Sequence, residues 1–373
     1  MKLRPSLRRL VRLFFVCFAL LLLSVGAVIA TSWHCDLHGQ IQPPTSDPSE
    51  RKAATAGIKD YSRPEDDSYL SYPEWYIVWS YQEKADFQEK HLPSGFPYLG
   101  SVRQYWNSYC CISHLIRGKY PLNGGEQFML VIIGTSFSVE YILKGIYEKT
   151  IGKLSEWTSI YQPVDEDHYA YQVARDYADF VHIRPFYEFR FARHVKGLWS
   201  KTPFWGTHPI RKWERKIFLT LDYTLEAFYC WLIQIATHVT YGYEPADTYA
   251  WIDNVNESVL RQLPRVKMMK QVGPQALIVD IPRYQEFTSV ASVLAESDVL
   301  FVEIAGNAHI SASVIAPQAW HYDHTGAQEL FSNTVLTHPE LKRIVMGCDV
   351  PSLHGVLHTL REEGIIVEHI YDY

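Results

Sequence analysis

The last third of the chain carries two sets of residues whose side chains could do chemistry. Glu303 and His309 lie on either side of a Gly-Asn pair, and a carboxylate beside an imidazole can transfer protons. His321, Asp323 and His324 follow in a later segment, and imidazole and carboxylate groups are common ligands of zinc and other transition metals. These residues are therefore candidates for an acid–base pair and for a metal site.

Both sets also have a structural interpretation. Residues 276–281, 299–305 and 309–316 alternate between apolar and polar side chains, so their apolar residues share one face of a sheet. The other face carries Asp280, Glu303, His309, Ser311 and Ser313. We expect this face to dock on the rest of the protein, and a polar binding site that includes Asp280, Ser311 and Ser313 is the alternative. Two histidines three positions apart occur readily by chance in a chain with 16 histidines, so we expect no bound metal or other cofactor.

The segments around these residues predict an α+β domain over residues 266–373. Strand and helix patterns alternate, with strands at 276–281, 299–305, 309–316, 343–348 and 365–371 and helices at 284–296 and 352–363. Gly306 and Asn307 favour a tight hairpin between the second and third strands, and residues 317–339 form an insertion. Two β-α-β units around a hairpin strand are typical of a ferredoxin-like α/β sandwich, with helices on one face of one sheet.

The first 31 residues indicate the compartment. Residues 13–30 carry no charge, and their length approaches the roughly 20 residues that cross a bilayer. Five basic residues precede this run and mark its cytoplasmic end: Lys2, Arg4, Arg8, Arg9 and Arg12. We therefore predict an uncleaved transmembrane anchor in residues 1–31, with the rest of the chain outside the cytoplasm. Cleavage as a signal peptide near Val28, Ile29 and Ala30 is the alternative.

Residues 32–68 predict a linker that holds the folded part away from the bilayer. Pro43, Pro44, Pro48 and Pro64 interrupt it, and it has few large apolar residues with which to form a core. The six cysteines of the chain are too few and too scattered for a disulfide framework. A single bond outside the cytoplasm is the alternative, for example between Cys35 and one member of the adjacent pair Cys110 and Cys111.

Residues 69–265 predict an aromatic-rich, mainly helical domain. The chain has 25 Tyr, 17 Phe and 11 Trp, concentrated between positions 61 and 251. Rings with a polar tip suit protein interfaces, membrane surfaces and buried sites with a hydrogen-bond partner. This composition is consistent with an aromatic core, a binding surface, or both.

Two long apolar segments in this domain, 128–147 and 217–240, raise the question of further membrane spans. Each has charged residues four positions apart on one helical face: Glu140 and Lys144 in the first, and Asp222 and Glu226 in the second. Each charge costs about 2.5 to 3.5 kcal/mol at the centre of a bilayer. We therefore expect both helices to pack inside the folded body, which leaves one membrane span.

A three-span topology is the alternative. Arg211, Lys212, Arg215 and Lys216 immediately precede the second apolar segment, and they fit the excess of basic residues on the cytoplasmic side of spans. The loop between the two segments would then be cytoplasmic and the C-terminal region would be outside.

Three motifs resemble an uncharacterised family of membrane-anchored bacterial proteins. They are YPEWYIV at 72–78, TSFSVEYILKGIYE at 135–148 and ERKIFLTLDY at 214–223. The resemblance implies a bacterial envelope setting for most of the chain after the linker. It implies no activity and no catalytic residue.

The net charge and the absence of familiar motifs limit the classes of function that the sequence supports. The formal net charge of -6 is modest, and no basic cluster outside the N-terminus interleaves with aromatic residues, so we expect no nucleic-acid partner. The sequence has no motif of the familiar hydrolases, nucleotide-binding proteins or zinc proteases. We therefore predict a single-pass protein of the bacterial inner membrane, with most of the chain periplasmic, that binds or scaffolds an envelope partner. An envelope enzyme that uses Glu303 and His309, or the histidine-rich segment with a metal, is the alternative.

Overall fold

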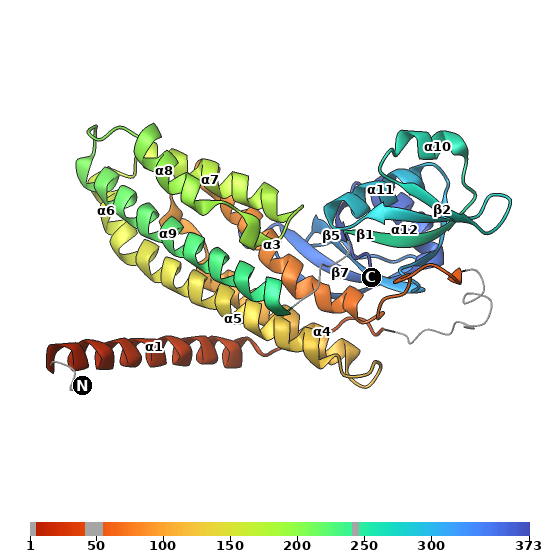
Figure 1. Cartoon of the computed structure of the whole chain (residues 1–373), viewed down its shortest axis with the longest axis horizontal. Coiled ribbons are helices and arrows are strands. Elements are labelled where there is room, and N and C mark those ends of the chain that lie inside the picture. Colours follow the sequence, from red (N-terminus) through yellow and green to blue (C-terminus); the bar gives the residue numbers. More distant parts are fainter. Residues whose placement is uncertain (1–4, 42–54, 241–245) are drawn as a thin grey trace.

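The computed structural model describes residues 5–41, 55–240 and 246–373. Figure 1 shows an elongated helical body beside a part built on β-sheets. The helices that precede the sheets are α1 (Pro5–Ser32), α3 (Asp67–Lys90), α4 (Tyr98–Ile116), α5 (Gly124–Tyr147), α6 (Lys153–Thr158), α7 (Asp165–Val181), α8 (Phe191–Lys201) and α9 (Pro209–Thr240). Lys2 and Arg4 of the basic N-terminus lie outside the described residues, as do the linker prolines Pro43, Pro44 and Pro48.

Aromatic side chains form the core of the helical body. Helix α3 contributes Tyr69, Tyr72, Trp75, Tyr76 and Trp79, all at most 6% exposed, to a cluster shared with α4 and α5. The aromatic residues of 69–265 therefore serve first as a helical core. A second, smaller cluster joins α7, α8 and α9.

The C-terminal part contains two antiparallel sheets of four strands each, in the orders β2-β3-β1-β4 and β6-β7-β5-β8. The strands are β1 (Asp247–Asp253), β2 (Lys267–Gln271), β3 (Leu277–Pro282), β4 (Leu300–Ile304), β5 (His309–Pro317), β6 (Ala327–Thr334), β7 (Leu341–Asp349) and β8 (Ile366–Ile370). The helices are α10 (Glu257–Gln262), α11 (Gln285–Glu296) and α12 (Leu353–Glu362). The five predicted strands and two predicted helices of this part are confirmed, and the chain is α+β.

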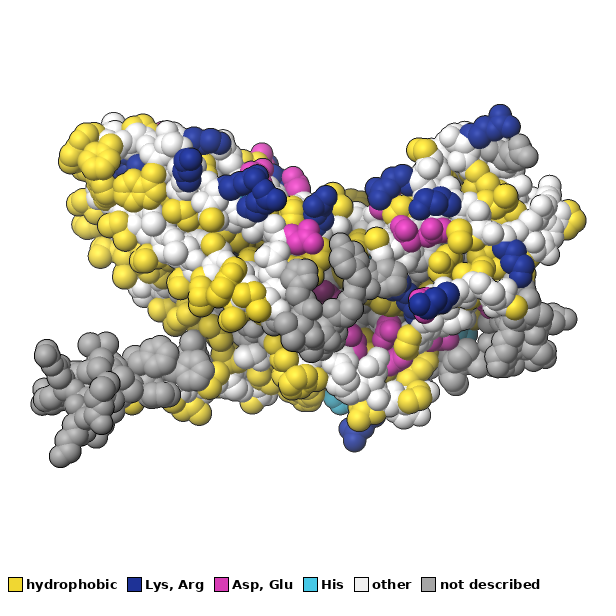
Figure 2. Space-filling model, in the orientation of Figure 1, with side chains coloured by type: hydrophobic (Ala, Val, Ile, Leu, Met, Phe, Trp, Pro, Cys, Tyr) yellow, Lys and Arg dark blue, Asp and Glu magenta, His cyan; other side chains and the backbone are white. Residues whose placement is uncertain are grey.

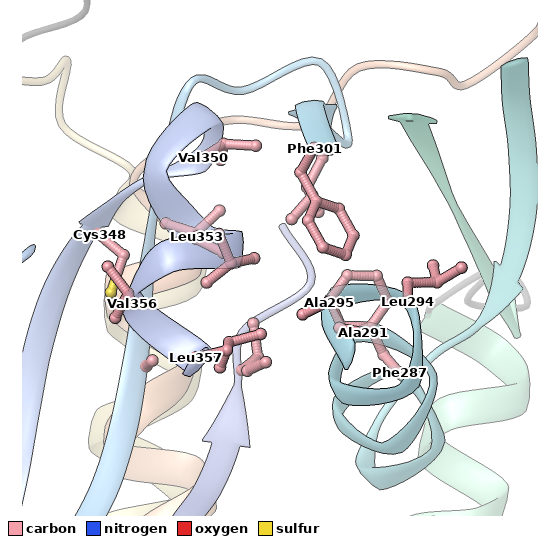
Figure 3. Close-up of a cluster of buried hydrophobic side chains, with 14 of the residues drawn as sticks. Phe287, Ala291, Leu294, Ala295, Phe301, Cys348, Val350, Leu353, Val356 and Leu357 are labelled. Atoms are coloured by element: carbon pink, nitrogen blue, oxygen red, sulfur yellow. The ribbon is translucent and has the colours of Figure 1, made fainter. Parts of the chain in front are cut away.

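Both sheets share one hydrophobic core with α11 and α12. Figure 3 shows the two helices next to each other, with Phe287 and Leu294 on α11 and Leu353 and Leu357 on α12. Phe287, Leu294 and Leu353 are fully buried. Apolar residues at helical spacing on both helices therefore fix the position of the two sheets relative to each other.

The arrangement of the strands differs from the single sheet of the predicted ferredoxin-like sandwich. Strand β4 pairs with β1, whereas β5 pairs with β7 and β8. The predicted tight turn is present as one antiparallel bridge between Ile304 and Asn307, but the two strands separate beyond it and do not form a hairpin. Ala305 and Gly306 both have positive φ, and the chain passes from one sheet to the other there. A Cβ on Gly306 would overlap Ser62, so this crossing requires glycine.

Three observed strands, β1, β2 and β6, are not predicted from the sequence. Strand β1 precedes residue 266 and lies between β3 and β4, so the first sheet reaches back to Asp247. Strand β2 has a polar sequence, and β6 lies in the predicted insertion 317–339. Only Leu330 and Phe331 of β6 are buried, so its apolar pattern is too short to predict a strand.

The described parts of the predicted linker pack on the folded body. Ile41 and Tyr61 are buried, and Lys119 donates a hydrogen bond to the Ile41 carbonyl at 2.6 Å. Cys35 forms a disulfide bond with Cys111 of α4, which is one of the two pairings that the sequence leaves open. The segment that follows α1 is therefore fixed covalently to the helical body.

Candidate functional site

The predicted acid–base residues have separate partners. Glu303 in β4 is 1% exposed and accepts a hydrogen bond from the Tyr61 hydroxyl at 3.1 Å. His309 in β5 lies 3.5 Å from a Glu65 oxygen and 3.2 Å from an Asp349 oxygen. Glu303 therefore helps to hold residue 61 on the first sheet, and His309 lies at the start of the second sheet.

The other residues of the predicted polar face are divided between the two sheets. Asp280 lies in the first sheet, 3.7 Å from the Lys267 ammonium, and burial raises its pKa. The Ser311 amide in the second sheet donates to the Ser68 hydroxyl of α3 at 2.8 Å. The Ser313 hydroxyl accepts from Tyr371 at 3.4 Å. Ser311 thus docks on the helical body, and the five polar residues do not form one binding face.

The histidine-rich segment does not converge on one point. His321 lies 3.4 Å from Glu329, whereas His324 lies 2.8 Å from Glu363. Asp323 lies with His324 along an open groove beside α12. Among the residues that the structure describes, no group of three His, Cys, Asp or Glu side chains is placed to hold a metal ion.

A cluster that the sequence analysis did not treat as a site lies between α3, α5 and α9. The ammonium of Lys144 is 2.8 Å from Glu140, 3.1 Å from Asp222 and 3.0 Å from Glu226. These four side chains are 12% to 19% exposed. We call them, together with Lys84 of α3, the lysine cluster.

The spacing along two helices assembles this cluster. Glu140 and Lys144 share one face of α5, and Asp222 and Glu226 share one face of α9, because each pair is four residues apart. Tyr147 of α5 stacks on Phe218 of α9, with ring centroids 3.9 Å apart, and keeps the two charged faces together. The i, i+4 charges within apolar segments were the available signal, but sequence alone does not show that the two helices face each other.

The lysine cluster lines a cavity of about 50 Å³. The Tyr81 hydroxyl donates to Glu140 at 2.7 Å, and the Lys84 ammonium lies 5.9 Å from the centre of the Tyr141 ring. Burial, followed by repulsion from Lys144, lowers the pKa of Lys84. Burial raises the pKa of Glu226 to about 7, against the attraction of Lys144. Although burial opposes it, attraction by Lys144 and Lys84 lowers the pKa of Glu140. Glu226 is therefore the carboxylate of the cluster that holds a proton most readily near neutral pH.

A second group of buried ions, the arginine layer, lies at the N-terminal end of α9. Arg211 is 2.7 Å from Asp167 and 3.0 Å from Glu214, while Arg215 is 2.7 Å from Glu148 and 3.1 Å from Asp167. Both arginines are at most 1% exposed.

Lys212 and Lys216 are buried in the same region and pair with Glu166 at 3.0 and 3.3 Å. The four basic residues that we considered as a cytoplasmic signal are thus internal ion-pair partners. They do not form an exposed basic loop, and their support for a three-span topology is lost.

The surface of α5 and α9 is strongly apolar. Their exposed large hydrophobic residues, which we call the apolar face, are Phe128, Val131, Ile132, Leu143 and Ile146 of α5 and Ile217, Leu221, Leu225, Phe228, Trp231, Leu232 and Ile235 of α9. Figure 2 shows hydrophobic side chains gathered over the lower and left parts of the helical body, with charged side chains along its upper edge. Within the described residues, the segment 124–158 is long and apolar enough to cross a membrane, with 39% of its most apolar window buried.

Comparisons with family models, curated proteins and solved structures found no match.

Proposed function

We propose that this chain is a single-pass protein of the bacterial inner membrane whose helical body rests on the outer surface of the bilayer. The anchor would be α1, most of the chain would be periplasmic, and the apolar face would dip into the lipid. The observation that carries this proposal is the one-sided distribution of exposed apolar and charged residues on the helical body.

The apolar face has the dimensions of a lipid contact. In the segments 128–146 and 217–235, every exposed residue is uncharged. At about 1.5 Å per residue, each segment of 19 residues is roughly 28 Å long. An exposed apolar surface of this extent marks a membrane or protein contact. Lipid is the occupant we favour, because the predicted anchor already holds the body beside the bilayer.

Charged residues on the opposite side of the helical body are evidence against a bundle that crosses the bilayer. Asp176 and Asp179 of α7 and Arg193 and Lys196 of α8 are exposed there. If the whole bundle crossed the membrane, each of these charges would face lipid at about 2.5 to 3.5 kcal/mol near the centre. A body that lies in the plane of the membrane keeps them in water, as amphipathic interfacial helices do.

The disulfide bond supports a position outside the cytoplasm. Bonds of this kind form and persist in the periplasm and are rare in reducing compartments. Cys35 follows α1 directly and joins Cys111 in α4. The first segment after the anchor and the helical body would therefore share the oxidising side of the membrane.

Binding or scaffolding is the role that this arrangement supports. The body would hold the two-sheet part at the membrane surface, where an envelope protein could contact it. In the two-sheet part, the resemblance to a ferredoxin-like fold would be limited to two β-α-β units. They are β3-α11-β4, which surrounds β1, and β7-α12-β8, which surrounds β5. An envelope enzyme based on Glu303 and His309 has less support, because Glu303 is buried against Tyr61.

Thiol labelling of the full-length protein in intact cells tests the topology. A cysteine introduced by Asp176→Cys should react with a membrane-impermeant maleimide once the outer membrane is permeable. Arg9→Cys should react only after the inner membrane is opened, and the unchanged chain gives the background. Protection of position 176 until the inner membrane is opened would contradict the proposal and favour three spans.

A further inference from the structure

The cavity between α3, α5 and α9 is lined by more carboxylates than cations. Its ionisable lining residues are three cations, Lys84, Lys144 and Arg215, and four carboxylates, Glu140, Glu148, Asp222 and Glu226. The remaining titratable residues of the lining are the tyrosines Tyr81, Tyr98, Tyr177 and Tyr223, which are neutral near pH 7. If all carboxylates were ionised, one negative charge would therefore lack a counter-charge.

The ion pairs within the cavity place the excess negative charge at the lysine cluster. Arg215 and Glu148 pair with each other at 2.7 Å. Lys144 alone is surrounded by Glu140, Asp222 and Glu226. Lys84 forms no ion pair within the described part of the chain and lies over the Tyr141 ring instead. Three carboxylates thus compete for one close ammonium group.

The geometry brings the three carboxylates into mutual repulsion. Each has an oxygen within 3.1 Å of the same Lys144 nitrogen. Two such oxygens are therefore at most about 6 Å apart, a distance at which like charges in a poorly hydrated site disfavour joint ionisation. Paired carboxylates in active sites respond by sharing one proton.

We propose that the cavity is a proton-binding site, in which Glu140, Asp222 and Glu226 share one proton around Lys144. The proton balances the excess charge of the lining, and the two carboxylates that stay ionised both contact Lys144. On deprotonation the third carboxylate charge around Lys144 is uncompensated, so the contact between α5 and α9 weakens as the pH rises.

Three further observations support this site. Burial raises the pKa of Glu226 to about 7. The cavity of about 50 Å³ is large enough to accommodate water. The buried Oε2 atom of Glu148 has no hydrogen-bond partner among the described residues, so the cavity offers a polar surface to such water. All these residues lie in the interior of the body, so the site does not depend on whether the outer face contacts lipid, protein or water.

Infrared spectroscopy of the full-length protein in mild detergent tests the proposal, because a protonated carboxyl group has its own carbonyl band. The parent protein should carry Asp67→Asn, since Asp67 titrates in the same range. We expect the carboxyl band to be present at about pH 6 and to disappear as the pH rises, with the midpoint of its loss at about pH 7. Glu226→Gln should remove it, because three cations then face three carboxylates. Glu296→Gln, at an exposed carboxylate, is the matched control and should leave it unchanged.

Two further measurements test how the midpoint depends on charge. Lys84→Met removes a positive charge, so the midpoint should move to higher pH. Replacement of sodium chloride by choline chloride at equal ionic strength should leave it in place. A band that Glu226→Gln leaves unchanged, or no titration between about pH 5 and pH 9, would overturn the proposal. A midpoint that falls when sodium is present would also overturn it, because the charge would then be balanced by a metal cation.

Discussion

Arg343 in β7 donates a hydrogen bond to Glu83 in α3 at 3.0 Å, and this contact joins the sheets to the helical body. The same guanidinium holds Glu368 of β8 at 2.6 and 2.8 Å. The Arg343 side chain is 3% exposed. One cation therefore compensates two carboxylates at the boundary between the two parts of the protein.

Arg343→Met should destabilise the protein strongly. The change leaves Glu83 and Glu368 buried without their cation, and removal of one partner from a buried ion pair typically costs about 3 to 5 kcal/mol. Thermal unfolding of the full chain in detergent measures the loss. Arg361→Met is the control, because Arg361 and Glu296 are 67% and 49% exposed and should contribute at most about 1 kcal/mol. Equal effects of the two variants would show that the Arg343 contact is not the main link.

Cys35→Ser should lower the stability of the protein isolated from an oxidising compartment. The bond to Cys111 spans 76 residues, and closing a loop of this length in the unfolded chain corresponds to about 4 kcal/mol. Cys110→Ser should have little effect, since Cys110 is a free thiol. Mass spectrometry of the unreduced protein should find the peptides of Cys35 and Cys111 linked. Two free thiols at these positions would contradict both the bond and the argument for the compartment.

Gly134→Ala should disturb the packing of α5 against α4. A Cβ at this position would overlap the ring of Tyr105, whose hydroxyl is held by the Leu130 carbonyl at 2.6 Å. Overpacking of this kind costs about 1 to 3 kcal/mol. Gly355→Ala in α12 is the matched control, because a Cβ there meets nothing within 4 Å. That change should be neutral or stabilise the helix by up to about 1 kcal/mol. Denaturation midpoints in the opposite order would refute the described packing.

Asp67→Asn should change how stability depends on pH. Burial, followed by repulsion from Asp66 and Glu126, raises the pKa of Asp67 from 3.8 to about 7. The native state therefore holds this proton more tightly than the unfolded state, so the stability it provides is present at low pH and is lost as the pH rises to about 7.

An asparagine at position 67 resembles the protonated form at every pH. The variant should match the original protein near about pH 4 and have the higher melting temperature near about pH 8. A constant difference between the two proteins over this range would show that Asp67 does not titrate as described.

The local patterns of the sequence were sufficient for much of the two-sheet part. Alternation in 309–316 and the helical spacing in 284–296 both correspond to observed elements, β5 and α11, because each buries a regular face in one core. The pairing of strands was not predictable in the same way. Gly306 has the chemistry of a hairpin turn, but the contact with Ser62 and the partners of β5 lie far away in the sequence.

The charged residues show the same limit. The spacing of Glu140 and Lys144 placed them on one helical face, but it gave no indication that Asp222 and Glu226 would face them. Arg211 and Arg215 are typical of a cytoplasmic end when their segment is considered alone, but both pair with Asp167, which lies on another helix, α7. Net charge along a segment does not reveal which charges are buried in pairs.

The most direct test of the proposed membrane contact is a depth profile along α9. Spin labels at Ile217, Leu225 and Ile235 of the full chain, reconstituted in lipid vesicles, report contact with oxygen in lipid and with a water-soluble nickel complex. The account predicts lipid contact at similar, shallow depth for all three, and water contact for a label at Asp176. A depth that is greatest at Leu225 and falls toward both ends would show that α9 crosses the bilayer, and water contact at all three would show that lipid does not cover the apolar face.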